Sequence, residues 1–247
     1  MRGEYWAPDV ATYTMDYYDP HEPIEALESE REQVNQCLEA LREAGVISHT
    51  DYDEARLLEM RQQVADNFEL PWTSISQRIQ RLLYALNSIR QPKVLLAAGI
   101  FCGFTYICNA GAAVGPGACY EAEELIGVEV VPEAAETAEC NVRSLGESTT
   151  AKLVTADAVE FAESYPGAID LLYLDVGGTT CGDKALNFDV LLACWEKLPK
   201  GALIMCHDTA TYTEKLGPYL DFVRDPANCT ISFNVMLDKE GLEVSVK

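Results

Sequence analysis

The sequence predicts an α/β fold: a central, mostly parallel sheet that follows a helical extension and ends in an antiparallel hairpin. From residue 93 onward, short apolar runs alternate with segments of helical spacing. This alternation is typical of a parallel sheet with helices on both faces. Near the end of the chain, residues 229–236 and 242–246 read as two strands joined by a short turn, which predicts an antiparallel hairpin.

The first 90 residues contain helical patterns instead of strand patterns. Residues 1–20 lack clear periodicity, but their five aromatic side chains predict an arm that packs on its own domain or on a second subunit. We expect this extension, 1–90, to cover the substrate side of a domain formed by 91–247 or to form a homodimer. The expected helices are 23–45 between Pro23 and Gly45, a second from Asp51 or Asp53 to about 67, and a third from Thr73 or Ser74 to Ile89.

The alternating region predicts five parallel strands and the helices between them. Ligands of such sheets bind beyond the carboxyl ends of the strands. The expected strands are 94–98, 125–129, 151–155, 169–174 and 201–206, and the expected helices are 103–113, 133–145, 158–164 and 184–197.

The glycine turn within KVLLAAGIFCGFTY organises the rest of the chain. The apolar run Val94–Ala98 stops at Gly99, and Gly103 follows four residues later. Glycine permits positive φ and a close approach of backbone to a ligand, and the following helix offers unpaired N–H groups. The spacing differs from the G-x-G-x-x-G of dinucleotide sites, and the same pattern is compatible with a purely structural turn.

Acidic residues follow four of the predicted strands. Glu129 suits the two hydroxyl groups of a ribose, although an acid also suits the start of a helix. Asp157 could bind an adenine amino group or simply cap the next helix. Asp175 and Asp208 could share a hard divalent cation, or could be hydrogen-bonded to loop backbone.

These features occur in the order found in one enzyme family. Residues 73–247 resemble the class I S-adenosylmethionine-dependent methyltransferases, and among them the catechol and caffeoyl-CoA type O-methyltransferases. The resemblance rests on the third helix, the glycine turn, Glu129, the Ala-Asp-Ala around Asp157, Asp175 and Asp208. It implies a Rossmann-like methyltransferase fold with a mostly parallel seven-stranded sheet and an antiparallel C-terminal hairpin.

The resemblance also implies roles for individual residues. S-adenosylmethionine would lie on the glycine turn, with its ribose at the second strand and its adenine at the third. A divalent cation such as Mg²⁺ would bring a substrate hydroxyl to the methyl group. The implied cofactor-binding residues are Gly99, Phe101, Gly103, Thr105, Glu129, Asp157, Ala158 and Asp175, and the implied metal ligands are Asp175, Asp208 and Thr209.

Three positions depart from the family pattern. Ala97 stands where an acid usually anchors the amino group of the cofactor, and Thr209 replaces a usual Asn ligand. Gly178 stands where the catechol-type enzymes have their Lys base. Lys184, further along that loop, and His207, whose unperturbed pKa is ~6.5, are therefore the candidate bases beside the catalytic Asp175. Because neighbours on a strand face opposite sides, His207 is expected to point away from the site.

Composition excludes several classes of protein. The net charge of −22 disfavours nucleic acid and anionic membranes as partners. The nine cysteines are dispersed without a C-x-x-C pair, which predicts free thiols instead of a zinc site. No apolar run reaches the ~18 residues of a membrane span, and the N-terminal segment lacks a signal-peptide pattern, so we expect a cytoplasmic protein.

The expected function is methyl transfer to an oxygen, hydroxyl or carboxylate, of a small molecule, with or without a divalent metal. One alternative is a methyltransferase-like binding or assembly module that has lost its chemistry, which the departures at Ala97, Thr209 and Gly178 would favour. Another is a nicotinamide-dependent oxidoreductase, suggested by the turn and Glu129. The glycine spacing and the terminal hairpin argue against this second alternative.

Overall fold

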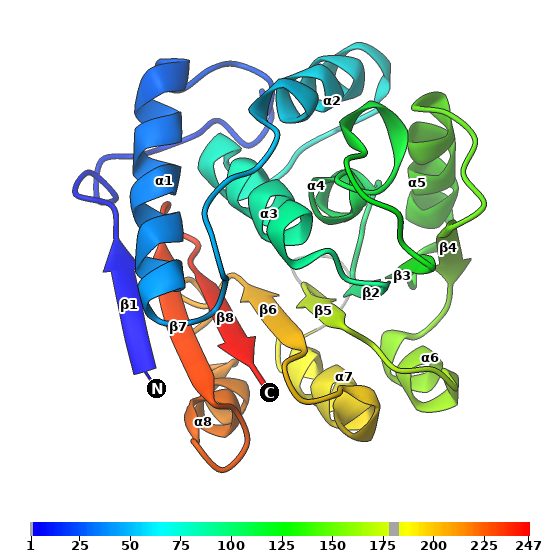
Figure 1. Ribbon diagram of the computed structural model, residues 1–247. Coiled ribbons are helices and arrows are strands. Elements are labelled where there is room, and N and C mark those ends of the chain that lie inside the picture. Colours follow the sequence, from blue (N-terminus) through cyan, green and yellow to red (C-terminus); the bar gives the residue numbers. More distant parts are fainter. Residues whose placement is uncertain (1, 178–182) are drawn as a thin grey trace.

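The computed structural model describes residues 2–177 and 183–247. Within them an eight-stranded sheet has the order β1-β7-β8-β6-β5-β2-β3-β4 (Figure 1). The strands are β1 Arg2–Trp6, β2 Val94–Ala98, β3 Glu124–Glu129, β4 Ala151–Thr155, β5 Leu171–Leu174, β6 Leu203–His207, β7 Ile231–Met236 and β8 Leu242–Val246. The helices are α1 Leu27–Glu43, α2 Glu54–Asn67, α3 Gln77–Arg90, α4 Phe104–Ala110, α5 Pro132–Ser144, α6 Ala158–Ser164, α7 Leu186–Cys194 and α8 Gly217–Arg224, with 3₁₀ turns at Gly115–Gly117 and Trp195–Lys197.

The predicted fold class is confirmed. Strand β2 pairs in parallel with β3 and β5, and β5 pairs in parallel with β6. Strand β8 runs antiparallel to both β6 and β7. The parallel centre places the carboxyl ends of β2, β3, β5 and β6 at one edge of the sheet, where ligands of such folds bind.

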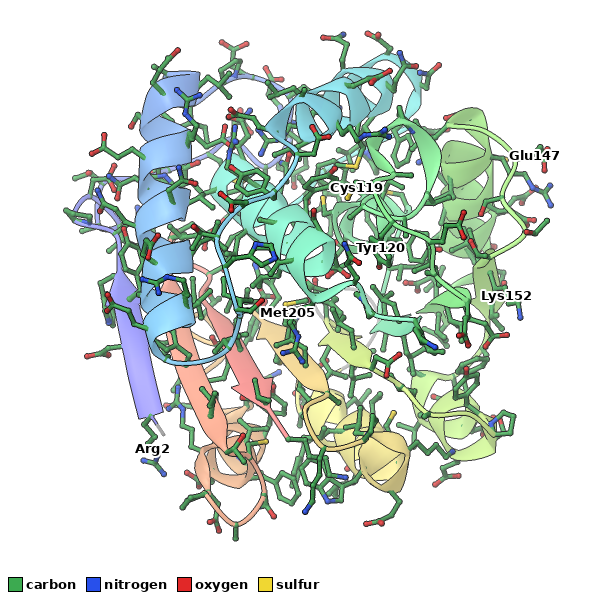
Figure 2. The ribbon with its side chains drawn as sticks, viewed as in Figure 1. Arg2, Cys119, Tyr120, Glu147, Lys152 and Met205 are labelled. Atoms are coloured by element: carbon green, nitrogen blue, oxygen red, sulfur yellow. The ribbon has the colours of Figure 1, made fainter. Side chains whose placement is uncertain are left out.

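Two apolar layers hold the helices on the sheet. Successive residues of a strand face opposite sides, so Leu95 belongs to the core beneath α1–α5 while Leu96 belongs to the core beneath α6–α8. Figure 1 shows these two groups of helices on opposite sides of the strands, and the side chains that fill the space between them appear in Figure 2. None of the described helices is long and apolar enough to cross a membrane.

The extension differs in part from its sequence prediction. Strand β1 lies parallel to β7, with Arg2 opposite Ser232 and Trp6 opposite Met236, so the sheet gains an eighth strand. The first helix begins at Leu27, four residues after Pro23. Asp53, one of the two expected caps, accepts a hydrogen bond from the N–H of Arg56 at the start of α2.

The third helix starts later than predicted. Ser76 caps it, because the Ser76 hydroxyl accepts a hydrogen bond from the N–H of Ile79 at 3.3 Å, and neither Thr73 nor Ser74 is the cap. Those two residues lie outside the helix and line a pocket instead. Helix α8 was not among the expected helices.

Two buried arginines of α3 fasten the extension to the rest of the fold. The guanidinium of Arg78 pairs with Asp9 at 2.8 Å and with Glu25 at 2.6 Å. The guanidinium of Arg81 pairs with Glu30 and Glu54, both at 2.7 Å. Since α1, α2 and α3 also share the apolar core of the sheet, the helices of the extension form part of one layer of the fold.

Candidate active site

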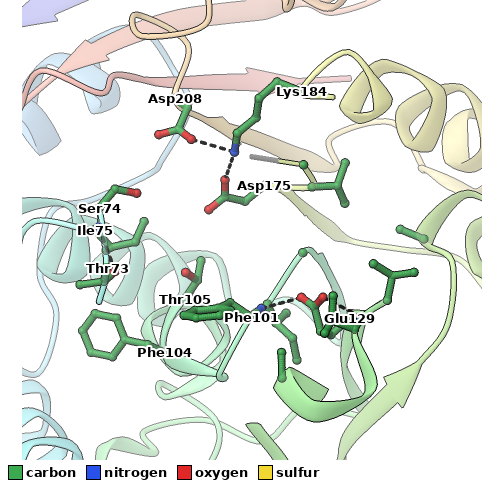
Figure 3. Close-up of a pocket in the computed structure, with 18 of the residues that line it drawn as sticks. Thr73, Ser74, Ile75, Phe101, Phe104, Thr105, Glu129, Asp175, Lys184 and Asp208 are labelled. Carbon is green, nitrogen blue, oxygen red and sulfur yellow. Dashed lines mark hydrogen bonds and ion pairs between the residues drawn. The ribbon is translucent and has the colours of Figure 1, made fainter. Parts of the chain in front are cut away.

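A pocket of about 830 Å³ lies at the carboxyl edge of the parallel strands. Its walls come from the segments after β2, β3, β4, β5 and β6, as the topology of the sheet predicts. Residues from the extension close its remaining side. Figure 3 shows Glu129 at one end of this pocket, and Asp175, Lys184 and Asp208 at the other.

The glycine turn is required by close backbone packing. Gly99 has φ +81°, and a Cβ atom added to it would lie 2.5 Å from the carbonyl oxygen of Asp175. Glycine alone therefore lets the turn pass the end of β5, where it forms the floor of the pocket. Gly103 also has positive φ, but it faces Ala138 of α5 and is not among the residues that line the pocket. Its position indicates a packing role.

Glu129 holds the turn from the opposite side. Its Oε2 accepts a hydrogen bond from the N–H of Phe101 at 2.8 Å, and its Oε1 accepts one from the N–H of Val131 at 3.0 Å. These bonds fix the carboxylate at the end of β3 and support the φ of +50° at Phe101. A carboxylate has about four acceptor positions, so both oxygens keep capacity for hydroxyl groups of a ligand.

Asp157 is a helix cap, one of its two predicted roles. Its Oδ1 accepts hydrogen bonds from the N–H groups of Val159 at 2.8 Å and Glu160 at 3.1 Å. Asp157 and Ala158 nevertheless line the pocket, so the contact with adenine stays a prediction. Thr105 lines the same pocket beside the turn.

A cluster of charged groups occupies the far end of the pocket (Figure 3). The Nζ of Lys184 lies 2.6 Å from Oδ1 of Asp175 and 2.7 Å from Oδ2 of Asp208. The Nδ1 of His207 lies 3.0 Å from Oδ1 of Asp208 and 3.7 Å from Oδ2 of Asp175. In the described parts of the chain, Nδ1 of His207 has no hydrogen-bond partner, so both contacts are electrostatic. The cluster therefore joins three elements: the end of β5, the segment before α7, and the end of β6.

The charges in this cluster stabilise one another. Burial by itself would lower the pKa of Lys184, but the carboxylates of Asp175 and Asp208 outweigh burial and raise it. Burial likewise opposes a charge on His207, yet the same two carboxylates raise its pKa. Burial would raise the pKa of Asp208, but His207 and Lys184 lower it well below its usual range. An ammonium between two carboxylates is a poor proton acceptor, which disfavours Lys184 as a general base.

His207 and Thr209 lie beside the pocket and do not line it. His207 is fully buried, in accord with the expectation that it points away from the pocket, although its ring contacts Asp208. The Thr209 hydroxyl is buried and has no hydrogen-bond partner in the described parts of the chain. Gly178, where the resemblance places a Lys, lies outside the described residues.

The residues at this end do not fit the divalent cation that the resemblance implies. Asp175, His207 and Asp208 bring one ligand atom each within 4.8 Å of one another, as a metal site would require. However, the ammonium of Lys184 already bridges the two carboxylates. The sequence pattern identified the two acids but not the cation between them.

Aromatic side chains, most of them outside the family motifs, also line the pocket. The ring of Trp72 lies 5.3 Å from that of Phe101, and the N–H of Thr73 donates to the carbonyl of Tyr17 at 2.9 Å. Tyr17 and Thr211 both donate hydroxyl hydrogen bonds to Glu240. The aromatic lining residues are Tyr17, Tyr18, Trp72, Phe101, Phe104 and Tyr212. The only sequence signal for the first two was the aromatic content of the arm.

Known proteins agree with the fold and with the type of domain. Residues 96–209 match the family model of a methyltransferase domain, in agreement with the resemblance to methyltransferases stated from the sequence. No curated protein matches the chain.

Solved structures of methyltransferases have a similar fold. The S-adenosylhomocysteine-bound methyltransferase of Podospora anserina has a TM-score of 0.62 and 12% identity, covering 92% of this chain and 99% of its own. The O-methyltransferase of Bacillus cereus in complex with S-adenosylhomocysteine has a TM-score of 0.57 and 14% identity, covering 87% and 99%. A Streptomyces achromogenes O-methyltransferase of tomaymycin synthesis, in complex with S-adenosylmethionine, has a TM-score of 0.53 and 17% identity, covering 88% and 98%.

Proposed function

We propose that this protein transfers the methyl group of S-adenosylmethionine to an oxygen of a small aromatic acceptor. The observation that carries the proposal is that one pocket contains both a fixed carboxylate suited to a ribose and, opposite it, a charged cluster among aromatic walls. The match to a methyltransferase domain supports the choice of reaction.

The half of the pocket around Glu129 suits a nucleoside. Its carboxylate is already oriented by two backbone N–H groups, so binding two hydroxyl groups needs little further ordering. Small residues, Ala134, Ala156 and Ala158, line this half and leave room for a flat base. The residues present therefore fit the nucleoside part of S-adenosylmethionine.

The other half suits a flat acceptor. Rings from the arm, the turn and the segment after β6 enclose it, and offset or edge-on aromatic contacts stabilise such a ligand. Lys184 lies at the end of this half, where its ammonium can donate a hydrogen bond to an acceptor oxygen. A phenol or a carboxylate has such an oxygen.

The reaction consumes one acceptor and one S-adenosylmethionine. The bond between sulfur and the methyl carbon breaks as the bond between that carbon and the acceptor oxygen forms. The products are the methyl ether or ester and S-adenosylhomocysteine, and a hydroxyl acceptor loses its proton to solvent. The protein contributes mainly by holding the two reactants in line.

The proposal is tested by measuring S-adenosylhomocysteine formation from S-adenosylmethionine with panels of phenols and aromatic carboxylic acids. We expect acceptor-dependent turnover that falls more than about tenfold in Asp175→Asn, since this change removes one partner of Lys184. Asp183→Asn, at an exposed acid of the same region, is the matched control. Binding of S-adenosylmethionine without acceptor-dependent turnover would favour the alternative of a binding module. Ala97 on buried β2, one of the departures from the family pattern, supports the same alternative.

A further inference from the structure

We infer that the Lys184 ammonium is a built-in cation: it takes the place of a divalent metal between Asp175 and Asp208, and the site works without a metal. The contacts alone carry this inference. Its consequence for the choice of acceptor rests on the proposed methyl transfer.

The position of Lys184 coincides with the position that a metal would need. Its Nζ lies 2.6 and 2.7 Å from the inner oxygens of Asp175 and Asp208. Divalent Mg²⁺ and Ca²⁺ bind oxygen ligands at about 2.0–2.6 Å. A metal that bridged the same two oxygens would therefore overlap the ammonium group.

The outer oxygens of the two acids offer no separate metal site. They face Nδ1 of His207 at 3.7 and 3.0 Å, so a metal there would share both carboxylates with the ammonium of Lys184. Two cations would then repel each other in a place from which water is largely excluded, because the side chain of Lys184 is only 4% exposed. Removing Lys184 from the cluster would break two ion pairs at once.

Hydrogen bonds from Asn187 and close packing of the backbone at Gly177 fix the position of Lys184. The side-chain amide of the fully buried Asn187 donates to the carbonyl groups of Lys184 at 2.9 Å and Val176 at 3.1 Å, and its oxygen accepts from the N–H of Val176. Gly177 has φ +80°, and a Cβ added to it would lie 2.9 Å from the N of Lys184. The segment after β5 and the segment before α7 are therefore packed directly together, and this packing fixes the position of the ammonium group.

This arrangement narrows the class of acceptor. A metal with several open positions can bind two adjacent oxygens of one ligand. An ammonium has three N–H groups. In the described parts of the chain, the Nζ of Lys184 has two oxygen partners, Asp175 and Asp208, and its other neighbour is the ring of Tyr212 at 5.7 Å. Lys184 can thus donate to one acceptor oxygen, which favours an acceptor with a single phenolic hydroxyl or one carboxylate over adjacent hydroxyl groups.

The test is a titration of the full-length protein with Mn²⁺ in the presence of S-adenosylhomocysteine, with free Mn²⁺ measured by electron paramagnetic resonance. We expect the wild-type site to bind no Mn²⁺ more tightly than about 1 mM. Lys184→Ala should gain one site at least about tenfold tighter, and the double variant Lys184→Ala/Asp208→Asn should lose it. Lys215→Ala, which removes a lysine paired with Asp183 nearby, is the matched control and should resemble wild type.

One wild-type result would overturn the inference: stoichiometric, tight Mn²⁺ binding that disappears in Asp208→Asn. Binding that is equal in Asp208→Asn belongs to the acidic surface and agrees with the inference. If Lys184→Ala fails to fold, the titrations of wild type and Asp208→Asn still show whether the two acids bind a metal. Because this readout does not need turnover, failure of the metal inference and failure of the proposed methyl transfer are distinguishable. Where turnover is found, its rate should be unchanged by a chelator and by added Mg²⁺. Turnover with phenols should also be faster than turnover with catechols.

Discussion

Gly99 links the sequence motif to the shape of the pocket. Its φ is +81°, and its missing side chain lets the turn after β2 approach the backbone of Asp175. Its N–H donates to the carbonyl of Val128 at 2.9 Å, so the turn is held on both sides. The floor of the pocket therefore depends on the absence of a single methyl group.

We expect Gly99→Ala to destabilise the protein more than the strain of a left-handed residue alone, which is about 1–2 kcal/mol. Gly201→Ala is the matched control, because Gly201 has φ +88° but nothing within 4 Å of an added Cβ. Urea unfolding measures how much each variant loses in free energy of unfolding. Calorimetry measures whether each variant still binds S-adenosylhomocysteine. Equal losses for the two variants, with binding intact, would contradict the role assigned to Gly99.

At the residue scale, the sequence located the acids but not their surroundings. Glu129, Asp175 and Asp208 follow strands, and strand ends of a parallel sheet share one edge, so their neighbourhood was predictable. The bridge made by Lys184 was not predictable, because it depends on the path of the segment between β5 and α7. Lys184 had been singled out as a candidate base, a role that the two flanking carboxylates disfavour.

At the scale of elements, the ion pairs of α3 hold the extension in place. Arg78 is fully buried and pairs with Glu25, whose side chain is 11% exposed, and with Asp9, whose side chain is 46% exposed. The hydrogen bonds from Arg78, despite some opposing burial, lower the pKa of Asp9. Helix α3 thereby connects the arm, the segment before α1 and the sheet.

Arg78→Met should lower the free energy of unfolding at pH 7 by about 3–5 kcal/mol, since it leaves Glu25 buried without its partner. Because the folded pKa of Asp9 is lowered, its contribution is present above its unfolded pKa of ~3.9 and is lost as pH falls through the folded value. The difference between wild type and variant should therefore narrow from pH 7 to pH 3.

Urea unfolding at the two pH values measures this difference. Arg42→Met is the control, because it removes an exposed pair with Glu39 and should cost at most about 1 kcal/mol. A gap between wild type and Arg78→Met that stays constant from pH 7 to pH 3 would contradict the contribution of Asp9.

Sequence analysis did not predict the elements whose partners lie far away in the chain. Strand β1 has five residues, and its partner β7 lies at the other end of the chain, so no local pattern reveals the pairing. By contrast, β2 through β6 alternate with helices, and this repeated pattern predicted their positions to within about two residues. Helix α8 is short and follows a segment without clear periodicity, which explains why it was missed.

At the scale of the whole molecule, the sheet and the extension together form the pocket. The sheet supplies Glu129 at one end and the ion cluster at the other, while the arm supplies Tyr17 and Tyr18. The match to a methyltransferase domain covers residues 96–209 only. Several residues that line the proposed acceptor half lie outside this match, namely Tyr17, Tyr18, Trp72 and Tyr212. No family motif covers them, so the sequence offered no prediction for that half.

The nucleoside of S-adenosylmethionine is proposed to bind in this pocket at Glu129. Isothermal titration of the protein with S-adenosylmethionine and S-adenosylhomocysteine tests this proposal. Glu124→Gln is the matched control, because Glu124 begins the strand that Glu129 ends and pairs with Lys152 away from the pocket. We predict one site per chain with a dissociation constant in the micromolar range, unchanged in Glu124→Gln and weakened at least about tenfold in Glu129→Gln through the loss of charged hydrogen bonds. Absence of binding, or equal binding by both variants, would contradict the account.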